Sequence, residues 1–120
     1  MVRQKNGVEK ILAQFIKETK KKISVQKIIL FGSYAKGTPK KTSDIDIAVI
    51  SPNFARMNEL QRIKLLLDCA HRIKYEIPVD IETFGYTPEE YENADYFDFL
   101  GVIKNAGKII YSQPGVSLLS

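Results

Sequence analysis

The sequence has one cysteine, one histidine and no long hydrophobic run, and each shortage excludes a class of protein. Cys69 alone cannot form an internal disulfide or a Cys-x-x-Cys metal site, so a reducing compartment is expected. His71 has no second histidine or cysteine at ligand spacing, and we interpret it as structural. No apolar run approaches the roughly 20 residues of a membrane span, and the N-terminal stretch MVRQKNGVEK lacks a signal peptide's apolar core. The sequence therefore predicts a cytoplasmic protein without membrane insertion.

The length of the chain indicates the number of domains, and its charge indicates the kind of ligand that it suits. A chain of 120 residues fits one domain with its own core. The formal net charge of +4 suits an anionic ligand, but it is smaller than the excess usual in proteins that bind nucleic acid directly. No repeat, low-complexity stretch or linker divides the chain. We therefore expect a single domain over residues 1–112 and a short C-terminal tail, residues 113–120, that is disordered.

Hydrophobic periodicity and turn residues predict an alternation of helices and strands. The expected helices cover about residues 5–22, 57–74 and 96–105, and a further helix starts in the capping box Thr87-Pro88-Glu89-Glu90. The expected strands cover residues 27–31, 44–50, 78–84 and 108–111. On the helix at 57–74, the core side is expected to carry Leu60, Ile63, Leu67 and Ala70. This order predicts an α+β protein in which helices back a small sheet.

Two pairs of carboxylates stand where strands normally carry apolar residues. Asp44 and Asp46 open one predicted strand, although aspartate is depleted in strands. Residues two apart in an extended chain share a face, so both carboxylates point the same way while Ile45 points to the core. Asp80 and Glu82 repeat this pattern in the third strand. If the strands lie close together, the crowded carboxylates need a counter-charge, and Mg²⁺ completed by substrate phosphates supplies one. Two such ions would stabilise both oxygens of a phosphoryl transfer.

A glycine-bearing loop precedes the first pair of aspartates. Gly32 follows a strand and lets the backbone approach a phosphate closely, while Ser33 opens a short helical segment and can donate a hydrogen bond. Three lysines of the same loop would neutralise triphosphate charge: Lys36, Lys40 and Lys41. Gly32 and Gly37 have the first spacing of a P-loop, but Thr38 and Pro39 follow where that motif requires lysine and serine or threonine. A P-loop is excluded.

The loop and the aspartates together resemble a known signature. A turn before a half-exposed strand would explain either feature alone. Gly32-Ser33, ten intervening residues and Asp44-Ile45-Asp46 resemble the polymerase-β-like nucleotidyltransferase superfamily, and the length is similar to its minimal nucleotidyltransferase (MNT) branch. The resemblance runs from the first strand to Tyr111. It implies a two-layer α+β fold, with a small mixed sheet and helices packed on one face. It also implies Mg²⁺-dependent transfer of a nucleoside monophosphate with release of pyrophosphate.

The resemblance also implies roles for individual residues. The catalytic and metal-binding positions, which would hold two Mg²⁺ ions, are Asp44, Asp46 and Asp80, with Glu82 as an added or substitute ligand. The third of these aspartates would help to activate the acceptor hydroxyl. The positions that would bind the triphosphate of ATP are Gly32, Ser33, Lys36 and Lys41. Lys36 stands where the family usually has arginine, and it keeps the charge but loses the bidentate geometry.

The resemblance also bears on the acceptor, the molecule that receives the nucleoside monophosphate. Larger relatives append a helical domain that holds the acceptor, so here a second copy or another protein is expected to provide it. The MNT branch resembles the smaller member of toxin–antitoxin pairs whose partner is a HEPN-type ribonuclease. This implies a type VII-like antitoxin that transfers AMP to a tyrosine of the toxin. Two alternatives stay open: a non-catalytic antitoxin that acts by stoichiometric binding, and an aminoglycoside-type nucleotidyltransferase that acts as a homodimer.

Aromatic residues in the last third of the chain allow two interpretations. They are Tyr86, Tyr91, Tyr96, Phe97 and Phe99. Most aromatic residues near a small sheet pack in its core, and that is our expectation here. Stacking on a nucleobase is the alternative for any one of them.

Overall fold

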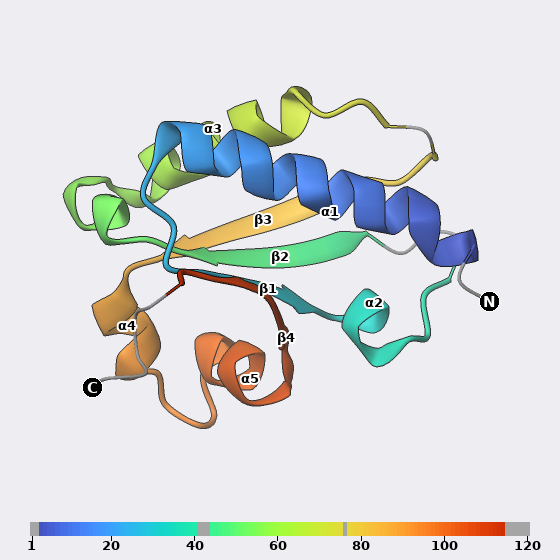
Figure 1. The fold of residues 1–120 in the computed structure, drawn as a ribbon. Helices are drawn as coiled ribbons and strands as arrows, with labels where there is room; N and C mark the ends of the chain where they lie inside the picture. The colour runs from blue at the N-terminus through green and yellow to red at the C-terminus, as the bar shows by residue number, and fades with distance from the viewer. Residues whose placement is uncertain (1–2, 41–43, 76, 115–120) are drawn as a thin grey trace.

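A four-stranded mixed sheet forms the centre of the protein (Figure 1). The computed structural model describes residues 3–40, 44–75 and 77–114. The strands are β1 (Lys27–Phe31), β2 (Ile45–Ile50), β3 (Ile81–Tyr86) and β4 (Lys108–Ser112). They lie in the order β3-β2-β1-β4, with β1 antiparallel to both β2 and β4, and β2 parallel to β3. The parallel pair places the carboxylate-bearing strands side by side, as the metal-site hypothesis requires.

Helices cover the sheet unequally. They are α1 (Arg3–Lys22), α2 (Ser33–Lys36), the 3₁₀ helix η1 (Pro52–Arg56), α3 (Glu59–His71), α4 (Pro88–Glu92) and α5 (Phe99–Ala106). Figure 1 shows the two long helices, α1 and α3, together on one face of the sheet, as expected. The short helices α4 and α5 lie on the opposite face, so the expectation that the helices pack on one face is wrong for these two. The α+β fold class with a mixed sheet is confirmed.

The two central strands are buried on both faces. In β2, Ile45, Ile47 and Val49 belong to the buried cluster that contains Phe15 of α1 and Leu66 of α3. The alternate residues of β1 and β2 enter a second cluster with α4 and α5, whose buried members are Ile29, Ala48, Ile50, Tyr91, Leu100 and Ile103. Strands that are buried on both sides have nearly continuous apolar sequences, which explains KIILF in β1 and IDIAVI in β2. The one polar residue within β2, Asp46, therefore stands out.

Local capping explains where two of the helices begin. The predicted capping box of α4 is confirmed, because the Glu90 N–H donates to Oγ1 of Thr87 (3.0 Å) and the Thr87 N–H donates to the Glu90 carboxylate (2.8 Å). A second capping box, between Asn58 and Gln61, starts α3.

Within the part of the chain that the structure describes, every helix is too short or too polar to span a membrane. Most of the predicted tail, residues 115–120, lies outside the described residues. Gln113, the first residue of that tail, donates its N–H to the Gln26 carbonyl (2.9 Å).

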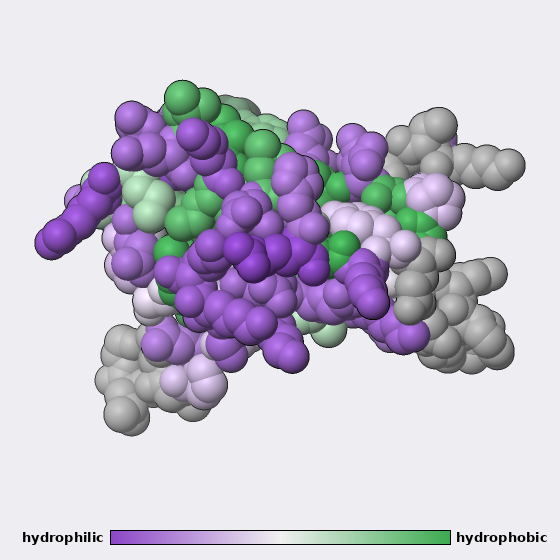
Figure 2. Space-filling model, turned by 90° about the horizontal axis from the view of Figure 1, so that it is seen from above, coloured by the Kyte–Doolittle hydropathy of each residue, from purple (hydrophilic) through white to green (hydrophobic). Residues whose placement is uncertain are grey.

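The predicted core side of α3 is wrong for three of its four residues. Leu60, Ile63 and Leu67 are exposed, and Ala70 alone lies in the core. The buried side is instead formed by Leu66, Cys69 and Ala70, continued by Ile73 after the helix. Apolar residues occur on more than one side of this helix, so the same period fits two faces and the sequence cannot choose between them. Figure 2 looks down on the helical face and shows hydrophobic area among hydrophilic surface.

The orientation of α3 can be tested with two adjacent leucines. Leu66 is 0% exposed and Leu67 is 42% exposed. Leu66→Ala should lower the free energy of unfolding by about 2–5 kcal/mol, because it leaves a cavity in the core. Leu67→Ala should lower it by less than about 1 kcal/mol, because its side chain is already half in water. Urea denaturation of both variants measures the difference, and equal losses would contradict this orientation.

Candidate active site

A tight turn at Gly32 joins β1 to α2. Gly32 has φ +76° and ψ −157°, a backbone region that essentially only glycine occupies. A Cβ atom at this position would collide with the carboxylate of Asp46. The turn therefore needs glycine for two reasons, its backbone conformation and the close approach of Asp46. The loop and the aspartate pair, twelve to fourteen residues apart in sequence, meet at this contact.

The segment after Gly32 forms the short helix α2, as predicted. The N–H groups of Ala35 and Lys36 both donate to the Gly32 carbonyl, at 3.1 and 3.2 Å. Gly37 ends the helix in the left-handed conformation, with φ +77° and ψ 19°. Ser33 is partly buried at the start of this helix, and Lys36 is exposed on its last turn. Lys41, the other predicted phosphate contact, lies outside the described residues.

Strand register places the carboxylates on one face of the sheet. Asp46 pairs with Phe31 of β1 on one side and with Glu82 of β3 on the other. The Ile45 N–H donates to the Asp80 carbonyl (2.9 Å), which continues the parallel pairing one residue before β3 begins. The alternation along a strand then puts Asp44, Asp46, Asp80 and Glu82 on the same face. This face is also the one that α4 and α5 partly cover, opposite the two long helices.

The electrostatics single out Asp46. Partial burial, a hydrogen bond with Glu82, and the negative charges of Glu82 and Asp44 together raise the pKa of Asp46 to about 6. All four influences act in the same direction, so they disfavour the ionised carboxylate. The site therefore favours a bound proton or a bound cation near Asp46. Asp80 is exposed, as are Asp44 and Glu82, but it is not among the groups that shift the pKa of Asp46. Its negative charge acts instead on Tyr75, whose pKa is raised by the burial of its hydroxyl and, to a smaller extent, by Asp80.

The residues present fit a divalent metal by their chemistry. Within residues 3–40, 44–75 and 77–114, no three side chains form a ready-made metal cluster. Magnesium needs fewer protein ligands, because one or two carboxylates plus waters and substrate phosphates complete its octahedron. The neighbourhood of Asp46 offers hard carboxylate oxygens with uncompensated negative charge, from Asp44 and Glu82 as well. Asp46 and its two acidic neighbours are therefore the residues that would hold such an ion.

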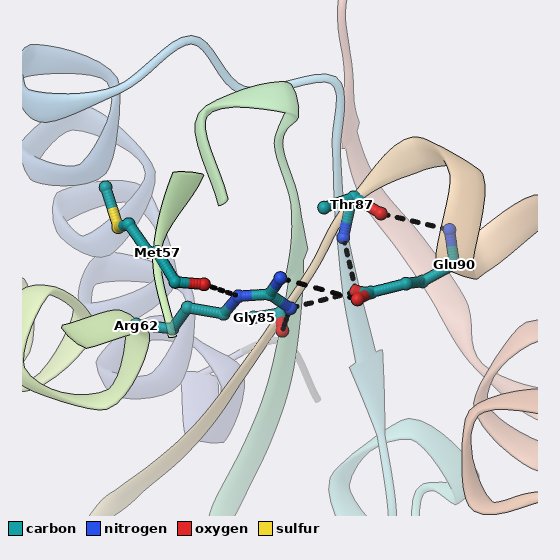
Figure 3. A network of polar contacts seen from close by, with 5 residues as sticks. All are labelled: Met57, Arg62, Gly85, Thr87 and Glu90. Atoms are coloured by element: carbon teal, nitrogen blue, oxygen red, sulfur yellow. Dashed lines mark hydrogen bonds and ion pairs between the residues drawn. The ribbon is translucent and has the colours of Figure 1, made fainter. Parts of the chain in front are cut away.

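A network around Arg62 closes one end of the outer strand β3 (Figure 3). The Arg62 guanidinium donates to the Gly85 carbonyl (3.2 Å) and to Glu90 (2.9 Å), and its Nε donates to the Met57 carbonyl (3.3 Å). Partial burial alone would raise the pKa of Glu90, but Arg62 and the Thr87 backbone hold this pKa below its ordinary value. A cleft of about 810 Å³ follows β3 from this network to Glu82. The cleft thus reaches the carboxylate site from the sheet edge.

Sequence reasoning missed the residues that surround the carboxylates on this face. Phe31 and Phe84 flank the site in β1 and β3, and Arg62 lines the cleft. A signal for Phe84 was available, since it stands two residues after Glu82 and shares its face. No signal existed for Arg62, because an arginine on an amphipathic helix normally faces water.

The tolerance of the turn to a side chain can be tested at its two glycines. Gly32→Ala should lower the free energy of unfolding by about 1–3 kcal/mol from backbone strain, and should displace Asp46 in addition. Gly37→Ala is the matched control: its φ is also positive, but nothing lies within 4 Å of the added Cβ. It should cost about 1 kcal/mol and leave Asp46 in place. Urea denaturation gives the stabilities, and the Asp46 carboxyl shift in NMR spectra reports displacement. An undisturbed Asp46 signal in Gly32→Ala would contradict the contact.

The raised pKa of Asp46 predicts a pH-dependent stability. Between about pH 4 and 6 the folded protein holds a proton on Asp46 that the unfolded chain has lost, so this carboxyl's contribution to stability falls as the pH rises. Asp46→Asn should therefore be more stable than the wild type above pH 6, and the difference should shrink toward pH 4. Asp68→Asn is the control, because Asp68 pairs with Lys22 (2.9 Å) and should show no such gain. Urea denaturation from pH 4 to 7 measures both, and a pH-independent difference for Asp46→Asn would refute the assignment.

Comparison with known proteins agrees with this geometry. The profile of the nucleotidyltransferase domain matches residues 12–104. A Methanocaldococcus jannaschii protein named "Putative protein adenylyltransferase MJ1305" is 31% identical over 105 residues, which cover 86% of this chain and 71% of that protein. The matched region extends from within α1 into α5, so it contains the Gly32 turn and all four carboxylates.

Solved structures give the same result for the fold. A toxin–antitoxin structure with AMP-PNP is similar with a TM-score of 0.60 and 26% identity, over 85% of this chain and 73% of that chain. A structure of the toxin–antitoxin pair MntA–HpeT is similar with a TM-score of 0.58 and 26% identity, over 86% and 73%. The resemblance drawn from the Gly-Ser turn and the aspartates is thereby confirmed, together with the polymerase-β-like fold. The chain belongs to the nucleotidyltransferase domain family and is a nucleotidyltransferase.

Proposed function

We propose that the protein transfers AMP from ATP to a hydroxyl group of a partner protein, in a Mg²⁺-dependent reaction in the cytoplasm. The observation that carries this proposal is the contact of the Gly32 turn with Asp46, whose carboxylate also meets Glu82. A turn that accommodates phosphates and a negatively charged cluster that attracts a divalent cation are the two requirements of nucleotidyl transfer. This arrangement supports the assignment of Gly32 and Ser33 to the triphosphate, and of Asp44 and Asp46 to the metal.

The proposed reaction assigns one task to each part of the site. Bound Mg²⁺ would neutralise charge on the phosphates and on the attacking and leaving oxygens. Gly32 and Ser33 hold the β- and γ-phosphates with backbone N–H groups and a hydroxyl, and Lys36 and Lys41 add positive charge. The acceptor oxygen forms a bond to the α-phosphorus while the bond to the pyrophosphate oxygen breaks. Asp80 takes the hydroxyl proton, as the resemblance implies for the third carboxylate, and its exposed side chain is open to an incoming hydroxyl group.

The acceptor we propose is a tyrosine of a HEPN-type toxin, with this chain as its antitoxin. Two similar structures are toxin–antitoxin pairs, and a similar archaeal protein carries an adenylyltransferase name. The geometry is compatible with a protein acceptor, because the cleft along β3 opens at the sheet edge and leads to Glu82. A tyrosine side chain on a partner that docks at this edge would reach the carboxylates without passing through the core.

The test uses labelled ATP, Mg²⁺ and the product of the neighbouring gene. Label should appear on the partner, and Asp44→Asn/Asp46→Asn should reduce labelling by at least about a thousandfold, because the Mg²⁺ that would stabilise the attacking and leaving oxygens is then no longer held. Asp68→Asn is the matched control, since this exposed aspartate on α3 pairs with Lys22 away from the site. It should label normally.

The outcomes separate the proposal from its alternatives. Label that survives the double variant would refute the assigned site. A partner that is neutralised equally well by wild type and double variant, without label, would show stoichiometric binding instead of catalysis. Label that appears on an added aminoglycoside in the absence of any partner would indicate a small-molecule nucleotidyltransferase, and the oligomeric state would then show whether two copies complete the site.

A further inference from the structure

Three phenylalanine rings pack together on the carboxylate face. Phe31 of β1, Phe84 of β3 and Phe99 of α5 form what we call the aromatic cluster. The ring centroids lie 5.6 Å apart for Phe31 and Phe84, 5.7 Å for Phe31 and Phe99, and 5.2 Å for Phe84 and Phe99. β2 lies between the two strands, and the small side chain of its residue Ala48 leaves room for rings from both neighbours to meet. Each ring thus contacts both others.

The aromatic cluster adjoins the carboxylate site directly. Phe31 is the residue before Gly32, and it pairs with Asp46 in the antiparallel register. Phe84 follows Glu82 by two residues on the same face, which is about 6.6 Å along a strand. The face is therefore divided along the strands: the carboxylates extend from Asp46 toward Asp44 and Asp80, and the rings begin beside Asp46 with Phe31 and continue away from it with Phe84. A nucleotide has the same division between its phosphates and its base.

The exposure of the aromatic cluster is uneven. Phe31 and Phe84 are partly buried, whereas Phe99 is 54% exposed although it touches both of them. Phe99 opens α5, and the residues of that helix that enter the core are Leu100, Gly101 and Ile103 instead. The fold therefore does not need the Phe99 ring for its core. Its exposed surface is free to contact a ligand that lies over the carboxylate face.

We propose that the aromatic cluster is the nucleoside subsite of this enzyme, with the base stacked on Phe99. This inference rests on the proposed function, because it takes the triphosphate to lie at Gly32 and the metal at Asp46. With the phosphates held there, the nucleoside lies over the next residues of the same face, which are the phenylalanines. The ligand class is any nucleoside, since every base has a π-face and no hydrogen-bonding group belongs to the cluster. Phe99 then contributes affinity without selecting adenine.

The neighbouring Phe97 provides a matched control. Phe97 is 90% exposed, and its ring contacts Tyr96 with centroids 5.1 Å apart, outside the aromatic cluster. Removing either phenylalanine deletes an exposed aromatic ring from the same region of the chain. Phe99 contacts Phe31 and Phe84 on the face that carries the carboxylates, whereas Phe97 does not belong to this cluster. Only the loss of Phe99 therefore removes a ring from that face.

The experiment compares ATP with inorganic triphosphate, both with Mg²⁺, by isothermal titration. Phe99→Ala should weaken ATP binding about 5- to 150-fold, which corresponds to the loss of one stacked base, and should leave the triphosphate affinity within about twofold. Phe99→Tyr should retain ATP affinity, because it keeps the ring. Phe97→Ala should bind both ligands as the wild type does. GTP should show the same loss with Phe99→Ala as ATP.

Four results would overturn the inference. In the first, Phe99→Ala binds ATP as tightly as the wild type. In the second, it loses ATP and triphosphate equally, which would indicate a disturbed phosphate site; circular dichroism and urea denaturation of this variant identify a folding defect, and Phe99→Tyr then decides. In the third, Phe97→Ala weakens ATP binding as much as Phe99→Ala. In the fourth, wild-type protein binds neither ligand, which would refute the proposed function itself and with it the subsite.

Discussion

The site depends on the approach of one carboxylate to one glycine. Asp46 is the single polar residue in a strand that is otherwise buried on both sides, and it is accommodated only because Gly32 has no side chain. The parallel pairing with β3 then adds Glu82 at the same level. Partial burial, the hydrogen bond with Glu82 and the resulting concentration of negative charge raise the pKa of Asp46, and an ionised Asp46 is unfavourable for the isolated protein. A divalent metal ion bound together with nucleotide phosphates would neutralise this negative charge, so the same carboxylates favour binding of the metal.

The two faces of the sheet have different roles, since one forms most of the core and the other carries the site. The face under α1 and α3 is filled by the larger of the two hydrophobic clusters and supplies most of the core. The opposite face is covered only in part, by α4 and α5, and leaves the carboxylates and an aromatic ring accessible. Because side chains alternate along a strand, each strand contributes to both tasks at once. A shift of register by one residue would therefore destroy core and site together.

Sequence reasoning succeeded where a local pattern has one structural solution. β1, the α4 capping box and the shared face of the carboxylates are of this kind. It failed for the buried side of α3, because leucines on several sides of one helix fit more than one orientation. The expectation that the aromatic residues late in the chain pack in the core is wrong for Tyr96, Phe97 and Phe99, which are exposed. The sequence offered Phe99 as a base-stacking residue but gave no indication of its partners Phe31 and Phe84, because the strand register and the return of α5 to the sheet bring the three rings together. Neither arrangement is encoded within a short window.

Arg62 also affects how the exposed edge of β3 can pair with other chains. In the parallel pairing, the Asp80 and Tyr86 carbonyls face β2, so the odd-numbered residues of β3 direct their backbone groups outward from the sheet. An outer strand of this kind can recruit another chain and so extend the sheet between molecules. The guanidinium binds the outward carbonyl of Gly85 and is itself fixed by Glu90. A foreign strand therefore meets a charged side chain at this end of β3, which discourages the edge-to-edge growth of sheets between molecules.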